Sequence, residues 1–324
     1  MQTKQQQMFP DEPENMNEPA NNAISPAEQW DQDSVRRSLD ELFNFARKYR
    51  SKETYYELIR FVARFRFYAP FNAMLVHMQM PGATYVAPRY RWVRDYQRRI
   101  RPGARPLVIL QPMGPVMFVF DVSDTEPEDG APELPREVTN PFEVRRGRIR
   151  GEHGQTIENA KRDGVYVGER DAGSQSAGLV RTAKSGRVVE FPIKEIPKPE
   201  FLIVPLRYEL LLNAKHSGEA KYATLVHELA HLYCGHLGTP NSRWWPDRLS
   251  LSNREEEFEA ESICYLVCDR LGIDNPSDAY LSNYVRGSGD DEIPAISLEC
   301  VMKASGLIEQ MGRGRLKPRK EKEH

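Results

Sequence analysis

The first half of the chain changes from helical to strand-like periodicity. Up to residue 79, apolar residues recur every three or four positions, as on one face of an α-helix. Three helices are therefore expected, beginning at Ser34, Ser51 and Phe71. Two short apolar runs follow and predict strands at 107–111 and 116–122.

The second half begins strand-like and ends helical. Between residues 140 and 192, short apolar runs separated by glycine-rich turns predict strands, and a further strand follows at 201–205. Helical spacing returns after Ser217, and the expected helices cover 218–234, 253–271, 276–280 and 296–311. The whole pattern predicts an α+β fold.

The helix after Ser217 contains His227-Glu228-Leu229-Ala230-His231, the H-E-x-x-H pattern. Two histidines four positions apart project from one side of a helix, so one Zn²⁺ can bind both imidazoles. Glu228 can then reach a water at the metal without being a ligand and act as the general base. The alternative is a buried helix whose histidines are satisfied by hydrogen bonds.

A zinc site of this kind needs a third protein ligand. His236 does not have the spacing of the extended three-histidine motif, so the helix at 253–271 is the better source. Glu259 shares a face with the apolar residues of that helix, where a carboxylate is costly unless it is paired or binds a metal. Glu259 is the predicted ligand and Glu261 the reserve.

Other residues of this half receive weaker roles. Glu255, Glu256 and Glu257 are expected to be solvated acids of the first turn, with Asn253 and Glu256 as the N-terminal capping pair. Candidate second donors to a transition state are Tyr233, His236 and Tyr265. Trp244 and Trp245 are expected either to line the cleft or to belong to a loop packed on the core.

Positive charge is concentrated in one segment. Residues 36–106 contain 16 Lys and Arg against 5 Asp and Glu, although the whole chain has a net charge of -2. The arginines alternate with aromatic residues, which suits a groove that binds phosphates and stacks the bases of a single-stranded nucleic acid. The alternative is a solvated basic face with the aromatic side chains in the core.

Composition bounds the remaining possibilities. The four cysteines lie in apolar helical contexts, which indicates reduced core thiols and a cytoplasmic protein. No secretory signal or membrane-spanning run is recognised. The expected organisation is a disordered arm at 1–33, a basic domain at 34–126, a linker at 127–140, a metallopeptidase domain at 141–312 and a charged, disordered tail at 313–324.

Two family resemblances cover most of residues 40–312. Thr224-Leu-Val-His-Glu-Leu-Ala-His231 resembles the core motif of the ImmA/IrrE zinc metallopeptidases, and Glu259-Ala-Glu-Ser262 lies where that family has its third ligand. The same segment is similar to that of gluzincins. The resemblance implies a minimal zincin-like domain with a sheet beside the H-E-x-x-H helix.

The basic segment resembles the N-terminal domain of ArdC-like antirestriction proteins. The similar motifs include Pro70-Phe-Asn72, Gln79-Met-Pro81-Gly and Arg91-Trp92, in the family's order. The resemblance implies a small α+β domain that binds single-stranded DNA. The candidate contacts are Arg64, Arg66, Asn72, Gln79, Arg91 and Trp92.

The sequence therefore predicts a zinc-dependent endopeptidase with an attached DNA-binding domain. It would act on a DNA-associated regulator of a mobile element or in antirestriction. The alternative is a protective single-stranded-DNA-binding protein whose zinc site is structural or rarely catalytic. A nuclease is disfavoured, because no cluster of acids suited to two metals is evident.

Overall fold

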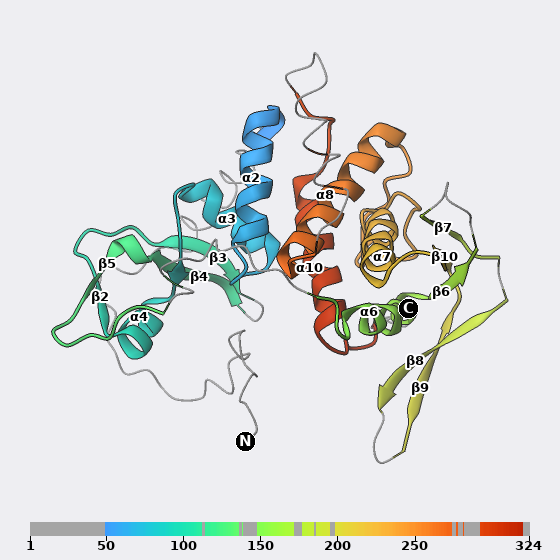
Figure 1. Ribbon diagram of the computed structural model, residues 1–324, viewed down its shortest axis with the longest axis horizontal. Helices are drawn as coiled ribbons and strands as arrows, with labels where there is room; N and C mark the ends of the chain where they lie inside the picture. Colours follow the sequence, from blue (N-terminus) through green and yellow to red (C-terminus); the bar gives the residue numbers. More distant parts are fainter. Residues whose placement is uncertain are drawn as a thin grey trace. The chain divides into compact units, whose positions relative to one another are not determined.

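The computed structural model describes residues 49–111, 114–135, 138, 148–171, 177–184, 186–194, 198–273, 277, 281 and 292–319. They belong to the larger of two compact units, Ala46–His324. The predicted arm and the predicted helix from Ser34 lie outside the described residues, as does most of the helix predicted at 276–280. The described part has the predicted α+β fold (Figure 1).

The helices are α2 (Lys52–Arg64), α3 (Pro70–Gln79), α4 (Arg89–Tyr96), α6 (Glu152–Ala160), α7 (Gly218–Tyr233), α8 (Asn253–Leu271) and α10 (Leu298–Arg313). The strands are β1 (Val86–Ala87), β2 (Arg98–Ile100), β3 (Leu107–Gln111), β4 (Gly114–Asp121), β5 (Thr125–Pro127), β6 (Val165–Arg170), β7 (Gly178–Thr182), β8 (Val188–Lys194), β9 (Glu200–Pro205) and β10 (Tyr208–Asn213). No described helix is both long and apolar enough to cross a bilayer.

The basic half contains a sheet with the strand order β1-β4-β3, in which β3 is an edge. Helix α3 covers this edge with two side-chain amides. Asn72 exchanges a pair of hydrogen bonds with the backbone of Leu110, both at 3.0 Å. Gln79 does the same with Val108, both at 2.8 Å. The two amides, two turns apart on one face of α3, thus replace a neighbouring strand.

The second half contains a sheet with the order β6-β10-β7. Strand β10 is parallel to β6 and antiparallel to β7. Leu210 and Leu212 of β10 are buried, and α7 packs against both β10 and β7. Strand β7 is an edge of this described sheet and contacts α7, the helix that carries the H-E-x-x-H motif.

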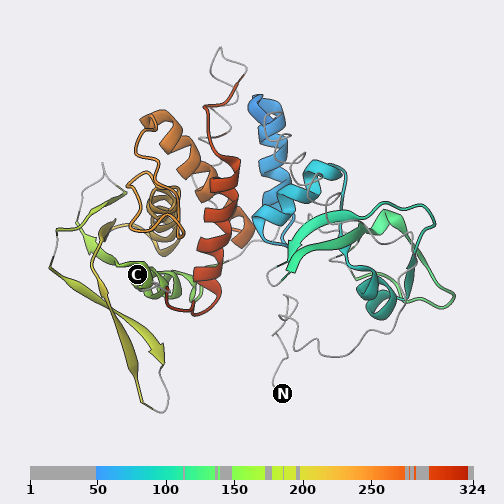
Figure 2. The ribbon, with the colours of Figure 1, turned by 180° about the vertical axis from the view of Figure 1, so that it is seen from behind.

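Helices α7 and α8 pack side by side, as both views show (Figures 1 and 2). As predicted, Ser217 caps α7, and its hydroxyl accepts a hydrogen bond from the amide of Ala220. The capping box of α8 lies one residue before the predicted pair and consists of Ser252 and Glu255. The hydroxyl that accepts from the first turn belongs to Ser252 because Asn253 is already helical.

Arg270 joins α8 to two other helices. Its guanidinium donates to the carbonyls of Val62, Phe65 and Tyr68, at and beyond the C-terminus of α2. The same group forms an ion pair with Glu309 of α10, and both side chains are less than 5% exposed. The basic half and the H-E-x-x-H half are therefore in direct contact through α2, α8 and α10.

Several features differ from the sequence prediction. Helix α4 and the strands β1, β2, β5 and β10 were not anticipated, and α6 lies within the segment predicted to be all strands. The start of the predicted disordered tail is held in place: Asn159 binds the backbone of Leu316, and Asp163 binds the guanidinium of Arg319. Asp163 is fully buried, so its charge requires such partners.

Candidate functional site

The two histidines of the motif direct one nitrogen each at the same point. The Nε2 atoms of His227 and His231 lie 3.1 Å apart. Four residues of helix rotate a side chain by about 400°, so both imidazoles leave α7 on the side that faces α8. This part of the prediction is realised in the geometry.

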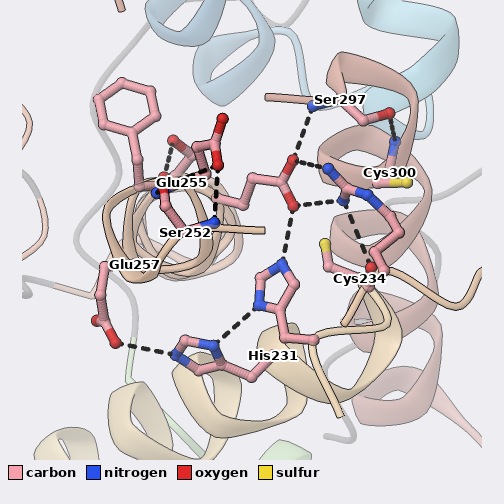
Figure 3. Close-up of polar contacts among 12 residues, drawn as sticks. His231, Cys234, Ser252, Glu255, Glu257, Ser297 and Cys300 are labelled. Carbon is pink, nitrogen blue, oxygen red and sulfur yellow. Dashed lines mark hydrogen bonds and ion pairs between the residues drawn. The ribbon is translucent and has the colours of Figure 1, made fainter. Parts of the chain in front are cut away.

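The acid that meets them is Glu257. Its carboxylate oxygens lie 3.5 Å from Nε2 of His227 and 3.6 Å from Nε2 of His231. Figure 3 shows the contact with His231. Among the described residues, the potential metal ligands that gather within 4.8 Å of one another here are His227, His231 and Glu257. The structure therefore does not bring the predicted ligand Glu259 into this group.

The correction follows from the rotation of α8. A step of two residues turns a helix by about 200°, so Glu259 points away when Glu257 faces α7. A step of four residues returns to nearly the same face. The reserve residue Glu261 accordingly has a carboxylate oxygen 3.7 Å from Nδ1 of His227, on the other side of that ring.

The spacing suits a tetrahedral metal ion. Ligand atoms about 2.0–2.1 Å from a tetrahedral centre lie about 3.3 Å from one another. The two Nε2 atoms are 3.1 Å apart, and each lies 3.5–3.6 Å from a different oxygen of Glu257, so the separations are close to that value. Two imidazoles and one carboxylate are also a donor set that leaves a fourth position for water or substrate.

Nearby charges shift the pKa values of His227 and His231 in opposite directions. Although burial opposes it, the acids Glu257 and Glu261 raise the pKa of His227. Burial and the charge of His227 lower the pKa of His231. His231 is therefore held neutral in the metal-free protein, as a metal ligand must be.

Glu228 lies between this group and the sheet edge. Burial raises its pKa, against the effects of His227 and of a backbone hydrogen bond at Val180 of β7. A Cβ atom at Gly178 of β7 would lie 2.4 Å from Cγ2 of Thr224 and 3.2 Å from Oε1 of Glu228. Only glycine lets β7 come this close, and a raised carboxylate pKa suits a group that accepts and returns a proton.

Glu259 is fully buried and has an arginine partner. Arg248 contacts both carboxylate oxygens, at 2.6 and 2.7 Å. His236 and the backbone amide of Ser297 bind the same carboxylate, at 3.0 and 2.7 Å. Burial opposes ionisation, but these bonds hold the pKa of Glu259 below its ordinary value. The sequence indicated that this acid is paired or metal-bound, and the structure gives it the pair.

Gly235 allows Arg248 to reach Glu259. Its φ is +82°, and a Cβ atom there would lie 2.0 Å from the carbonyl oxygen of Pro246. The amide of Arg248 then donates to the carbonyl of Gly235 at 3.0 Å. The residue that ends α7 thus also brings the following loop back onto the helix.

Other predicted site residues serve the core. The Tyr233 hydroxyl donates to Asp163 at 2.9 Å, and His236 uses both ring nitrogens within the buried cluster. Tyr265 is buried. Trp245 is 4% exposed and donates to the carbonyl of Gly238, so the loop-on-core alternative holds for it. Trp244 stacks with Arg207 and Arg319.

Three predicted nucleic-acid contacts have structural roles. Asn72 and Gln79 use both ends of their amides on β3. Trp92 is fully buried and donates its indole N–H to the carbonyl of Phe120. A base cannot stack on a ring with no exposed surface, so the aromatic-core alternative applies to Trp92.

The predicted arginine contacts differ in availability. Arg66 donates to the carbonyl of Asp269 at 2.8 Å, and Arg91 forms an ion pair with Asp95 at 3.1 Å. Arg64 is exposed at the end of α2. Further along, Tyr90 is 55% exposed, and the guanidinium of Arg94 lies 5.8 Å from the centre of its ring.

An H-E-x-x-H helix, an acid from the next helix and an adjoining sheet edge define a metallopeptidase-like fold. Residues 182–267 match the family model of the IrrE N-terminal-like domain, a peptidase family. This confirms the predicted resemblance of the C-terminal half. The matched segment contains α7 and the acidic start of α8, and covers about a quarter of the chain.

Two solved structures are similar, both of the antirestriction ArdC protein from the R388 plasmid. The metal-free one has 16% identity and a TM-score of 0.31, over 75% of this chain and 82% of that chain. The Mn(II)-bound one has 15% identity and a TM-score of 0.36, over 80% and 97%. No curated protein matches the chain.

Proposed function

We propose that the protein is a zinc-dependent endopeptidase. The observation that carries the proposal is the meeting of two imidazoles and one carboxylate beside Glu228. The two Nε2 atoms lie 3.1 Å apart, and the two oxygens of Glu257 lie 3.5 Å from His227 and 3.6 Å from His231, respectively. The ligands would be His227, His231 and Glu257. Zinc bound there would supply a Lewis acid, which acidifies water and polarises a scissile carbonyl.

Residues of the protein would bind the substrate and transfer the proton. Glu228 would take a proton from the attacking water and return it to the leaving amine. Among the described strands, β7 pairs only with β10, so its other edge could bind an extended peptide by backbone hydrogen bonds. Because β7 approaches Glu228 closely at Gly178, a peptide paired with β7 would lie next to this base.

Zinc analysis of purified variants tests the ligand set. Replacing Glu257 with Gln should weaken zinc binding by more than about 100-fold, because a direct ligand should matter at least as much as a group that only orients one. Glu256→Gln is the matched control, since it removes the adjacent charge about 100° around α8. Equal zinc affinity of the two variants would remove Glu257 from the site.

The substrate class follows from the sequence resemblance of the basic half. We propose that the protein acts on a DNA-associated regulator or in antirestriction. Comparison of protein abundance in cells that express the active and the inactive enzyme would identify its target. A target should decrease only with the active form.

A second function is favoured by the exposed surface of α4 and β2. Arg94 is 71% and Arg99 67% exposed at the side chain, and each also pairs with an acid, Asp95 at 2.6 Å and Glu126 at 2.7 Å. Arg94 lies beside the exposed ring of Tyr90. Cations next to an accessible ring suit single-stranded DNA, with Arg64 as a further exposed candidate. In this proposal the exposed ring of Tyr90, in place of the buried Trp92, stacks on a base.

Oligonucleotide binding measured across salt concentrations tests this surface. The double variant Arg94→Gln/Arg99→Gln should reduce the slope of log K against log salt by about 1.4, at about 0.7 per lost phosphate contact. Lys194→Gln, which removes an exposed charge on β8, should leave the slope unchanged. Absence of binding, or a flat salt response of the unmodified protein, would refute the proposal.

A further inference from the structure

The buried residues behind His231 form a continuous chain of polar contacts. Nδ1 of His231 lies 2.9 Å from Nδ1 of His236. Nε2 of His236 lies 3.0 Å from Oε2 of Glu259, which Arg248 also contacts. Figure 3 shows this chain continuing from His231 on the side opposite Glu257. The donors and acceptors along this chain of contacts can be assigned by starting at the end where the hydrogen-bond roles are fixed.

That end is Glu259. A guanidinium and a backbone N–H can only donate hydrogen bonds. Arg248 donates to both oxygens, and the amide of Ser297 donates to Oε1. Both oxygens therefore accept, and the bidentate contact with a guanidinium favours the ionised carboxylate of Glu259. His236 can bind it only by donating, so the proton of His236 is on Nε2.

The protonation of His236 determines which ring nitrogen of His231 carries a proton. A neutral imidazole with its proton on Nε2 has a lone pair on Nδ1. The bond between the two Nδ1 atoms consequently needs its proton from His231. That leaves Nε2 of His231 with a free lone pair, directed at His227 and Glu257.

The opposite assignment would require a doubly protonated His236. Its side chain is 2% exposed, and the Arg248 guanidinium already neutralises the same carboxylate. A second cation in this buried position would lack a partner and be costly. The neutral form is therefore favoured.

We propose that Glu259, His236 and Arg248 are positioning residues that fix His231 in the Nδ1–H tautomer and so prepare its Nε2 as a metal ligand. The inference rests on the proposed function, because it assigns His231 to the zinc site. It also gives a role to a buried acid and a histidine that the reaction does not use directly.

The same residues could be interpreted as a second metal site, since Cys234, His236 and Glu259 also gather within 4.8 Å of one another. The bidentate contact of Arg248 argues against this, because it places a positive charge on the carboxylate that a cation would need. The positioning role therefore predicts one zinc ion per chain.

Nitrogen-15 NMR of the metal-free, full-length protein tests the tautomer. The signals of His231 are assigned by their loss in His231→Gln. A protonated Nδ1 and an unprotonated Nε2 are expected. A His231 with its proton on Nε2 would overturn the proposal. This result does not depend on zinc binding, so it remains decisive even if the proposed peptidase function fails.

Zinc affinity, measured by competition with a chelator, gives the second test. His236→Phe should weaken zinc binding by about 10–100-fold, the usual cost of losing a partner that orients a ligand. His236→Gln should lose less, because an amide keeps a donor for Glu259 and an acceptor for His231. His216→Gln is the control and should bind as the unmodified protein does. Wild-type affinity in folded His236→Phe, or two zinc ions per unmodified chain, would overturn the proposal.

Discussion

Replacing Glu228 with Gln is expected to abolish proteolysis while zinc stays bound. The amide keeps the size of the side chain but cannot accept the proton of the attacking water. Loss of a general base costs about 10²–10⁴-fold in rate. The measurement is the cleavage rate of a target protein, together with the zinc content of the same preparation.

The control for this variant lies on the same helix. Glu219→Gln changes an exposed acid in the first turn of α7, two turns before the motif, and should leave cleavage intact. Undiminished cleavage by Glu228→Gln would eliminate the role of Glu228. Retained zinc without any target cleavage, even by the unmodified protein, would instead favour the DNA-binding alternative.

The largest loss of stability is expected for Arg270→Met. The substitution leaves Glu309 buried with Arg313, at 3.0 Å, as its one remaining ion-pair partner among the described residues, and removes the donor to three carbonyls at the end of α2. Breaking a buried ion pair by removing one partner costs about 3–5 kcal/mol. Chemical denaturation measures the change in the free energy of unfolding.

Two further variants separate the causes. Lys303→Met breaks an exposed ion pair with Glu299 on α10 and should cost less than about 1 kcal/mol. The double variant Arg270→Met/Glu309→Met should recover part of the lost stability, because no unpaired charge remains. An Arg270→Met protein as stable as the Lys303→Met protein would contradict the role assigned to Arg270.

The sequence predicted those features of the site that are determined within a single helix, α7. The spacing of His227 and His231 fixes their common face, and the cap at Ser217 and the glycine at 235 set the ends of α7. These are properties of a few consecutive residues. The same holds for β6, β7, β8 and β9, whose short apolar runs predicted strands, whereas the central strand β10 was not predicted.

The choice among the three acids of α8 depended on packing between helices. Glu259 was correctly expected to face the core, but the rotation of α8 about its axis decides which acid meets the histidines. That rotation is set by contacts from remote segments, such as Arg248 on Glu259 and Tyr55 of α2 on Ser262. No spacing within residues 253–271 encodes it. The sequence nevertheless indicated the right helix and the right kind of donor.

Aromatic and amide side chains in the basic half were misassigned for a related reason. Trp92 is the buried residue of a short arginine-rich helix, so composition alone suggested a surface. Asn72 and Gln79 are ordinary polar residues in sequence. Their pairing with β3 becomes visible only when α3 and the strand are placed together.

The amides of Asn72 and Gln79 also affect how the chain can associate. An uncovered outer strand offers a template on which other polypeptides add, and proteins commonly blunt it to prevent aggregation. Here α3 occupies the backbone groups of Val108 and Leu110 that would recruit such a chain. Intermolecular strand addition at β3 is thereby prevented, whereas the proposed substrate peptide would pair along β7, next to Glu228.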